Sequence, residues 1–168
     1  LLHTSKSGST FTIINSDVTV EDGSVYRGGI INTGNSGITI TLKNSTFTGG
    51  KVVGGVSGET TYHARGGQFY VASGSTLNAE NCTFTGGESA SKDAATYESQ
   101  GGNLFGYGTA KLNLTNCTVS DGVAPLGGNI GLTEGAKLKL DGCNFAPYKA
   151  FGIRGCGYAY VSDRVAKM

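Results

Sequence analysis

Residues 38–47 read ITITLKNSTF, and the pattern of this stretch recurs four more times along the 168-residue chain. Apolar residues stand four and two positions before a central residue, here Asn44, and another stands three positions after it. The centres of the five matching segments are Asn15, Asn44, Asn81, Asn116 and Gly142. Self-similarity at a period of roughly 20–50 residues is typical of solenoids, because each unit buries its apolar face only against its neighbours.

Each repeat predicts three short strands joined by turns. Apolar and polar residues alternate in stretches such as Leu112-Asn113-Leu114, which is the pattern of a half-buried strand. The alternation breaks at the central Asn, a residue that tolerates the left-handed backbone of a corner, and resumes in a second strand. A Gly-Gly pair precedes the third strand, as at Gly67. We therefore expect an all-β parallel β-helix of about five full coils and a shortened sixth near residues 152–165.

Two inserts interrupt this regular spacing. The next Gly-Gly pair comes 22 residues after Asn44 and 20 after Asn81, but only 11 after Asn116. The sequence therefore predicts excursions from one edge of the solenoid at about 51–65 and 88–100, within a single domain spanning 1–168. Inserts on one face of a solenoid often form its binding surface, although plain tolerated loops explain them equally well.

The composition argues against several classes of function. The 13 basic and 12 acidic residues are spread along the chain without a basic stripe, so we expect no nucleic-acid partner. No apolar run approaches the ~18 residues needed for a membrane span, so we expect no membrane insertion. The chain opens on Leu1 without an initiator Met or a signal peptide, which we interpret as a processed product or a fragment.

The cysteines occupy equivalent places in the repeat. Cys82, Cys117 and Cys143 each follow a segment centre, and Cys156 lies in the short last coil. Adjacent coils would place such Cα atoms about 5 Å apart, within reach of a disulfide. We expect Cys82–Cys117 and Cys143–Cys156 pairing; the alternative is a column of buried thiols packed with Ser45. No His/Cys cluster is present, so we expect neither a metal nor another cofactor.

Four asparagines fit the acceptor pattern for N-linked glycans, and we expect attached glycans if the source is eukaryotic and secreted. They are Asn44, Asn81, Asn113 and Asn116. The alternative for the three corner residues is a structural ladder in which each Asn bonds to the next coil. Asn113 differs because it lies between two inward leucines, and we expect it to point to solvent.

The Gly-Gly and Phe motifs resemble a known repeat. The chain carries Gly28-Gly29-Ile30-Ile31 and Gly127-Gly128-Asn129-Ile130, together with Phe47-Thr48-Gly49-Gly50 and Phe84-Thr85-Gly86-Gly87. Over roughly residues 8–150 this resembles the repeat of the polymorphic outer-membrane proteins, which are bacterial autotransporter adhesins. Here Gly replaces the last Asn of the Phe-x-x-Asn motif, and Ala never follows the Gly pair. The resemblance implies a right-handed, single-stranded β-helix that serves as an extracellular, mostly non-catalytic shaft.

Two other functions fit the residues less well. Polysaccharide-cleaving β-helices cluster carboxylates on one face, but the acids here are scattered, and Asp17 stacks with Thr46 rather than with a second acid. We therefore expect no enzymatic activity. An ice-binding face would use the outward column of Thr46, Thr83 and Thr118, but Lys43 and other charged residues interrupt the array beside it.

The favoured function is structural, and it rests on the lack of polar caps at the two ends of the solenoid. We expect a secreted or surface protein whose copies stack head to tail into a fibre, with an adhesin passenger fragment as the alternative and a polysaccharide-active enzyme as the further one. The expected assembly interface consists of Phe11, Ile13, Val18, Tyr158, Tyr160 and Val161.

Overall fold

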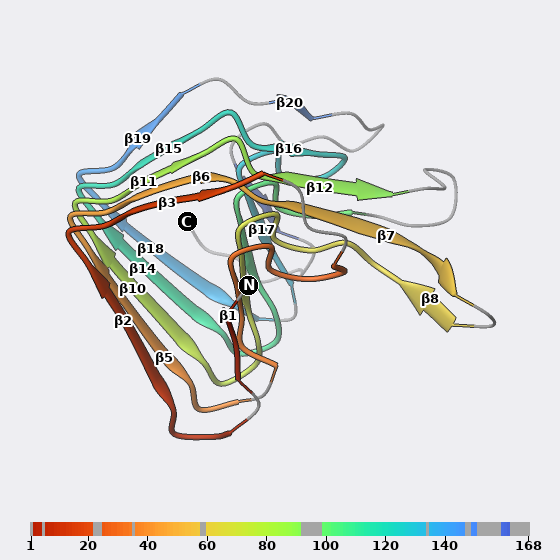
Figure 1. Ribbon diagram of the computed structural model, residues 1–168, viewed down its shortest axis with the longest axis horizontal. Helices are drawn as coiled ribbons and strands as arrows, with labels where there is room; N and C mark the ends of the chain where they lie inside the picture. Colours follow the sequence, from red (N-terminus) through yellow and green to blue (C-terminus); the bar gives the residue numbers. More distant parts are fainter. Residues whose placement is uncertain are drawn as a thin grey trace.

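The strands of the chain stack into four sheets, as Figure 1 shows for the computed structural model. The structure describes residues 2–4, 6–21, 25–34, 36–57, 60–91, 99–133, 135–146, 149–150 and 159–161. These residues contain strands, bridges and turns but no helix. Three of the sheets are wholly parallel, and strands that are neighbours in a sheet come from successive repeats. The architecture is all-β and consistent with a parallel β-solenoid, as the repeat predicts. One level of the stack is called a rung below.

The first two sheets lie on either side of the predicted Asn corner. The first sheet contains, in spatial order, β18 (Lys137–Asp141), β14 (Lys111–Thr115), β10 (Thr76–Glu80), β5 (Thr39–Lys43) and β2 (Thr10–Ile14). The second contains β19 (Asn144–Phe145), β15 (Thr118–Ser120), β11 (Thr83–Thr85), β6 (Thr46–Gly49) and β3 (Asp17–Val20). These are the two strands expected in every repeat.

The third sheet follows the Gly-Gly pairs, and the fourth lies along the edge that carries the inserts. The third contains β1 (Leu2–His3), β4 (Ile31–Asn32), β9 (Phe69–Val71), β13 (Leu104–Gly106), β17 (Ile130–Leu132) and β21 (Ala159–Val161). The fourth contains β20 (Lys149–Ala150), β16 (Val123–Ala124), β12 (Glu88–Ser91), β7 (Lys51–Ser57) and β8 (Thr60–Tyr62).

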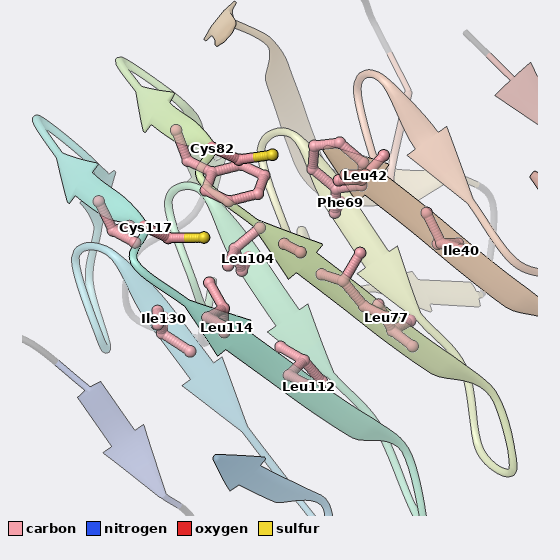
Figure 2. Packing of buried hydrophobic residues seen from close by; sticks show 14 of the residues in the cluster. Ile40, Leu42, Phe69, Leu77, Cys82, Leu104, Leu112, Leu114, Cys117 and Ile130 are labelled. Atoms are coloured by element: carbon pink, nitrogen blue, oxygen red, sulfur yellow. The ribbon is translucent and has the colours of Figure 1, made fainter. Parts of the chain in front are cut away.

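The core consists of like side chains stacked in register, as the alternation predicts. Leu77 lies beside Ile40 on one side and Leu112 on the other, and all three are fully buried. The Phe47 and Phe84 rings stack at 5.4 Å between centroids, and Phe69 from the third sheet meets both edge-on at 5.0 and 5.5 Å. Figure 2 shows Ile40, Leu77 and Leu112 side by side on successive strands, with their side chains in the core between the sheets.

The corner prediction is confirmed by the backbone. Asn15, Asn44, Asn81 and Asn116 have φ of 51°, 50°, 53° and 51°, and Gly142 has φ of 61°. This is the left-handed region, which costs an L-residue least when it is Asn or Asp and nothing when it is Gly. Because of this sharp corner, the side chain that follows the break in alternation again points inward. Both strands of a repeat therefore contribute to one core.

The fourth sheet corrects the prediction that each repeat has three strands. The first part of each insert belongs to the stack, because Lys51–Gly54 of β7 pairs in parallel with Glu88–Ser91 of β12. Val52 there is fully buried. The next part of the first insert is an excursion: Gly55–Ser57 of β7 pairs antiparallel with β8, and this hairpin projects to the right in Figure 1. The insert then rejoins the stack, where Arg65 bridges in parallel to Arg27 and Gln100. Of the second insert, 92–98 lies outside the described residues.

Candidate functional surfaces

The corner asparagines form a ladder along the outside of the solenoid. Asn44 Nδ2 donates a hydrogen bond to Asn15 Oδ1 at 3.1 Å, and Asn81 Nδ2 donates to Asn44 Oδ1 at 3.1 Å. Both amides are exposed, so these bonds give register and contribute little burial. The ladder alternative is therefore realised at Asn44 and Asn81. It engages the nitrogen to which a glycan would be attached, and glycosylation of Asn44, Asn81 and Asn116 stays a prediction.

Asn113 belongs to a second amide ladder on the outer face of the first sheet. It is half-buried, and its Nδ2 donates to Asn78 Oδ1 at 2.9 Å. The two residues line a shallow depression of about 180 Å³. An exposed ion pair between Lys43 Nζ and Glu80 Oε2, 2.9 Å apart, crosses the same rungs. Asn113 thus lies on the expected outer face but is paired along it.

The cysteine column contains free thiols in place of the expected disulfide. Cys82 and Cys117 are buried, Cys143 is half-buried, and all three are unbridged. Figure 2 shows the sulfurs of Cys82 and Cys117 pointing into the core. In-register strands hold neighbouring Cβ atoms about 4.8 Å apart, wider than the ~3.8 Å typical of a disulfide. The packed-thiol alternative describes this column, and Cys156 lies outside the described residues.

Hydrogen bonds link the two buried thiols to the backbone and to each other. The Cys82 and Cys117 sulfurs lie 3.3 Å from the carbonyl oxygens of Glu80 and Thr115. A thiol carries one proton, so Cys117 donates either to that carbonyl or to the Cys82 sulfur. Donation to Cys82 lowers the pKa of the Cys82 thiol to about 7, and the same bond, with burial, raises the pKa of Cys117. Each of the two buried thiols thus has a backbone carbonyl as acceptor, and the Cys82 sulfur is the alternative acceptor for Cys117.

A third set of amides is fully buried, and the sequence reasoning missed its role. Asn103 Oδ1 accepts a hydrogen bond from the Gly87 amide at 2.7 Å, and Asn103 Nδ2 donates to Ser120 O and Asn129 Oδ1, each at 2.9 Å. Asn129 Oδ1 also accepts from the Gly122 amide at 2.9 Å. These side chains satisfy buried turn backbone that the apolar core leaves without partners. The signal was visible in the sequence as an amide residue after successive Gly-Gly pairs.

An arginine–aromatic cluster lies on the outer face of the third sheet, separate from the main core. The Tyr70 and Phe105 rings stack at 5.7 Å between centroids. The Arg27 guanidinium lies 5.0 Å above the Tyr70 ring, and that of Arg65 lies 5.1 Å from Phe105 and 5.4 Å from Tyr107. Burial raises the pKa of the Tyr70 hydroxyl, and the positive charges of Arg27 and Arg65 partly oppose this increase. Sequence periodicity gave no sign of this cluster, because its residues lie in the loops and outward positions of three repeats.

The predicted assembly residues of the first coil lie at one end of the stack. Phe11 and Ile13 are only half-buried in β2, whereas Ile40 and Leu42, their partners in the next rung, are fully buried. Val18 in β3 is likewise half-buried. Figure 1 shows β2 at one edge of the first sheet and β18 at the other. The apolar columns are therefore open at the β2 edge.

An inward apolar residue at the opposite edge of the first sheet is also exposed. Leu140 in β18 is 44% exposed, whereas its in-register neighbour Leu114 is 1% exposed. The backbone of Tyr160 and Val161 lies in β21, which pairs with β17 at the far side of the third sheet from β1. Tyr158 lies outside the described residues. The predicted interface residues thus belong to opposite ends of the stack, as head-to-tail contact requires.

Among the described residues, no three His, Cys, Asp or Glu side chains gather closely enough to hold a metal ion. The same part of the chain has no apolar helix of membrane-spanning length.

Comparisons with known proteins give no match: no family model, no curated protein and no solved structure is significantly similar to the chain.

Proposed function

We propose that the chain is a non-catalytic, extracellular structural module whose copies stack end to end into a fibre. In this proposal the sheets form a right-handed, single-stranded parallel β-helix of about five to six coils, roughly 25–30 Å long at the ~4.8 Å strand spacing. The observation that carries the proposal is the partial exposure of inward apolar residues at both edges of the first sheet. Phe11 and Ile13 of β2 are only half-buried and Leu140 of β18 is exposed, although their neighbours one rung inward are buried.

The two ends are complementary position by position. Continuing the internal register would place Leu138 on Phe11, Leu140 on Ile13 and Phe145 on Val18 of the next copy, because these residues occupy the same columns. The edge strands would also gain backbone partners, which an isolated sheet edge lacks. A head-to-tail contact of this kind does not close on itself and generates a filament.

The alternative is a passenger fragment of a surface adhesin, which the resemblance to the autotransporter repeat supports. In that case the open ends would meet further coils of the same polypeptide. A polysaccharide-cleaving enzyme is less favoured by the arrangement of acids. Asp17 stands in register with Thr46, and Asp121 Oδ2 accepts a hydrogen bond from Thr85 at 3.1 Å, so neither is set against a second carboxylate there.

Sedimentation and negative-stain microscopy test the assembly directly. We expect the wild-type chain to form fibres whose length grows with protein concentration. Ile13→Lys should abolish them, because the charge would enter the junction, whereas Thr12→Lys on the outer face should leave them unchanged. A wild-type chain that remains monomeric at high concentration would exclude the fibre, and dispersed single rods would favour the adhesin alternative.

A further inference from the structure

We propose that the shallow depression on the outer face of the first sheet binds a neutral saccharide. The depression has a volume of about 180 Å³ and lies across three neighbouring rungs, on strands β5, β10 and β14. These strands lie inside the sheet, away from its two edges, so the proposal goes beyond the structural function and does not depend on end-to-end assembly. It rests on the unpaired polar atoms, the balanced charge and the position of the lining.

Two columns of outward side chains form the polar part of the lining. They are Thr41, Asn78 and Asn113 in the first column and Lys43, Glu80 and Thr115 in the second, two residues further along the same strands. In a parallel sheet such side chains repeat about every 4.8 Å from rung to rung and about every 6.6 Å along a strand. The depression therefore presents several polar groups within the width of a sugar ring.

The amides of the first column keep hydrogen-bonding capacity for a ligand. Asn113 Nδ2 donates to Asn78 Oδ1 at 2.9 Å, which leaves Asn78 Nδ2 as a donor and Asn113 Oδ1 as an acceptor without partners among the described residues. Both side chains are half-buried, so these two atoms belong to groups that neighbouring rungs hold in place. Ordered donors and acceptors of this kind bind a ligand without first losing much side-chain entropy.

Two hydroxyl groups extend this mixture of donors and acceptors. Thr41 and Thr115 are half-buried at the rim, and their hydroxyls have no hydrogen-bond partner in the described part of the chain. A hydroxyl both donates and accepts, as does the free pair of atoms that Asn78 and Asn113 present together. The ligand groups that match such a lining are themselves hydroxyls, which a saccharide carries on neighbouring ring carbons.

The charges of the lining cancel, which favours a neutral ligand. Lys43 Nζ lies 2.9 Å from Glu80 Oε2, and these two are the charged residues that line the depression. An anionic or a cationic group would have to displace the ion-pair partner, whereas a neutral hydroxyl leaves the pair intact. Glu80 is the one acid among the described residues of the lining, so the paired carboxylates of a glycosidase are missing. The depression therefore suits binding without cleavage.

The position of the depression argues against a peptide as the ligand. A peptide that binds to a sheet usually adds a strand at a free edge, through backbone hydrogen bonds. Each of β5, β10 and β14 already pairs with a strand on both sides, so no backbone edge is free there. The apolar atoms of the lining include the methyl groups of Thr41 and Thr115 and the methylene chain of Lys43. They would contact the C–H face of a sugar ring while the polar atoms bind its hydroxyls.

Titration with disaccharides tests the site. The full-length ¹⁵N-labelled chain, produced in a bacterial host so that Asn113 carries no glycan, is titrated separately with cellobiose, maltose and N,N′-diacetylchitobiose. We expect at least one of them to give saturable shifts of the side-chain N–H signals of Asn78 and Asn113, with a dissociation constant in the millimolar range, about −4 kcal/mol. The Asn44 amide in the corner ladder should not shift. No saturable shift with any of the three, or equal shifts at Asn44, would overturn the proposal.

Matched variants separate the depression from the rest of the surface. Asn78→Ala should weaken binding about fivefold or more, because it removes a ligand donor and the acceptor that orients Asn113. Thr41→Ala should weaken binding less, since it removes one hydroxyl. Thr48→Ala makes the same change on the outer face of the second sheet and should have no effect.

Equal weakening by Thr41→Ala and Thr48→Ala would refute the site, as would unchanged binding in Asn78→Ala. Thermal melts of each variant establish that the fold is kept, which we expect for these changes on the outer face. Fibre formation should be unchanged in all three variants, because none of the substituted residues lies at an edge of the first or second sheet. Failure of the saccharide site and failure of the fibre are therefore seen independently.

Discussion

At the residue scale, the corner asparagine contributes to the fold through both its backbone and its side chain. Its backbone takes the left-handed conformation of the turn, and its amide bonds to the equivalent residue one rung away. Asn is favoured there because its short polar side chain tolerates positive φ. The sequence indicated the corner clearly, but it left open whether the amide carried a glycan or a ladder, because both use the same residue.

Substitutions at Asn81 separate these two contributions. We expect Asn81→Ala to lower the free energy of unfolding by about 2 kcal/mol, since it strains a backbone with φ of 53° and removes the bond to Asn44. Asn81→Gly removes only the bond and should cost about 1 kcal/mol. Denaturant melts measure both values. Equal losses for the two variants would show that the left-handed backbone carries no penalty here.

The inward-outward phase of the strands is tested by two aspartates. Leu112 is fully buried between Leu77 and Leu138, whereas Thr118 lies half-buried on the outer face. Leu112→Asp should lower the free energy of unfolding by more than about 4 kcal/mol, because it buries an unpaired charge. Thr118→Asp should cost less than about 1 kcal/mol. If thermal melts showed similar losses of stability in the two variants, the assignment of inward and outward positions would be wrong.

At the element scale, the sequence predicts the strands of the first three sheets and misses those of the fourth. In the first sheet, β5, β10 and β14 follow a strict period of two, and the repeat predicts their register. The sequence predicts an insert where the structure has β7 of the fourth sheet, because Lys51-Val52-Val53-Gly54 has no clean alternation and follows a Gly-Gly turn. This segment joins the stack because it pairs with Glu88–Ser91 of the next rung. A local sequence pattern does not specify that pairing.

The turns between the elements depend on the buried amides. Asn103 accepts a hydrogen bond from the Gly87 amide, which would lose that partner in Asn103→Ala. It also donates to the Ser120 carbonyl, which would keep its second hydrogen bond, from the Gly86 amide at 3.3 Å. We expect this change to lower the free energy of unfolding by about 2 kcal/mol, since a buried unpaired group costs about 1–3 kcal/mol. Asn78→Ala, a matched change on the outer face, should cost under about 1 kcal/mol. Denaturant melts compare the two, and an equal cost would mean that water replaces the buried amide.

At the scale of the whole molecule, stacking explains both what was predictable and what was not. A repeat specifies its own columns, so the sequence predicts the core. The arginine–aromatic cluster could not be predicted in this way. In it, each arginine contacts an aromatic ring in the neighbouring column, one rung further along, and a repeat pattern does not specify contacts between columns. The unbridged thiols likewise follow from the in-register spacing of whole strands, which the positions of Cys82 and Cys117 alone do not fix.

The register of the proposed fibre can be tested with a cysteine already in the chain. Ser16 and Cys143 occupy the same column at opposite ends, where Ser16 N bonds to Ser45 Oγ at 3.1 Å and Cys143 follows Cys117. In head-to-tail stacking, Ser16→Cys would stand one rung from Cys143 of the next copy, about 4.8 Å away. We expect a short thiol-bridging reagent to give a ladder of multimers with this variant on denaturing gels.

The control variant Ser16→Cys with Cys143→Ala should give no ladder, because one partner thiol is missing. Head-to-head contact would join like residues and stop at dimers, since that interface closes on itself. A ladder that appears with the first variant and disappears with the control therefore requires the columns to continue from one copy into the next. Fibres that form without any cross-linking would contradict the register while leaving another mode of assembly, and the packing of Leu140 on Ile13 would then be wrong.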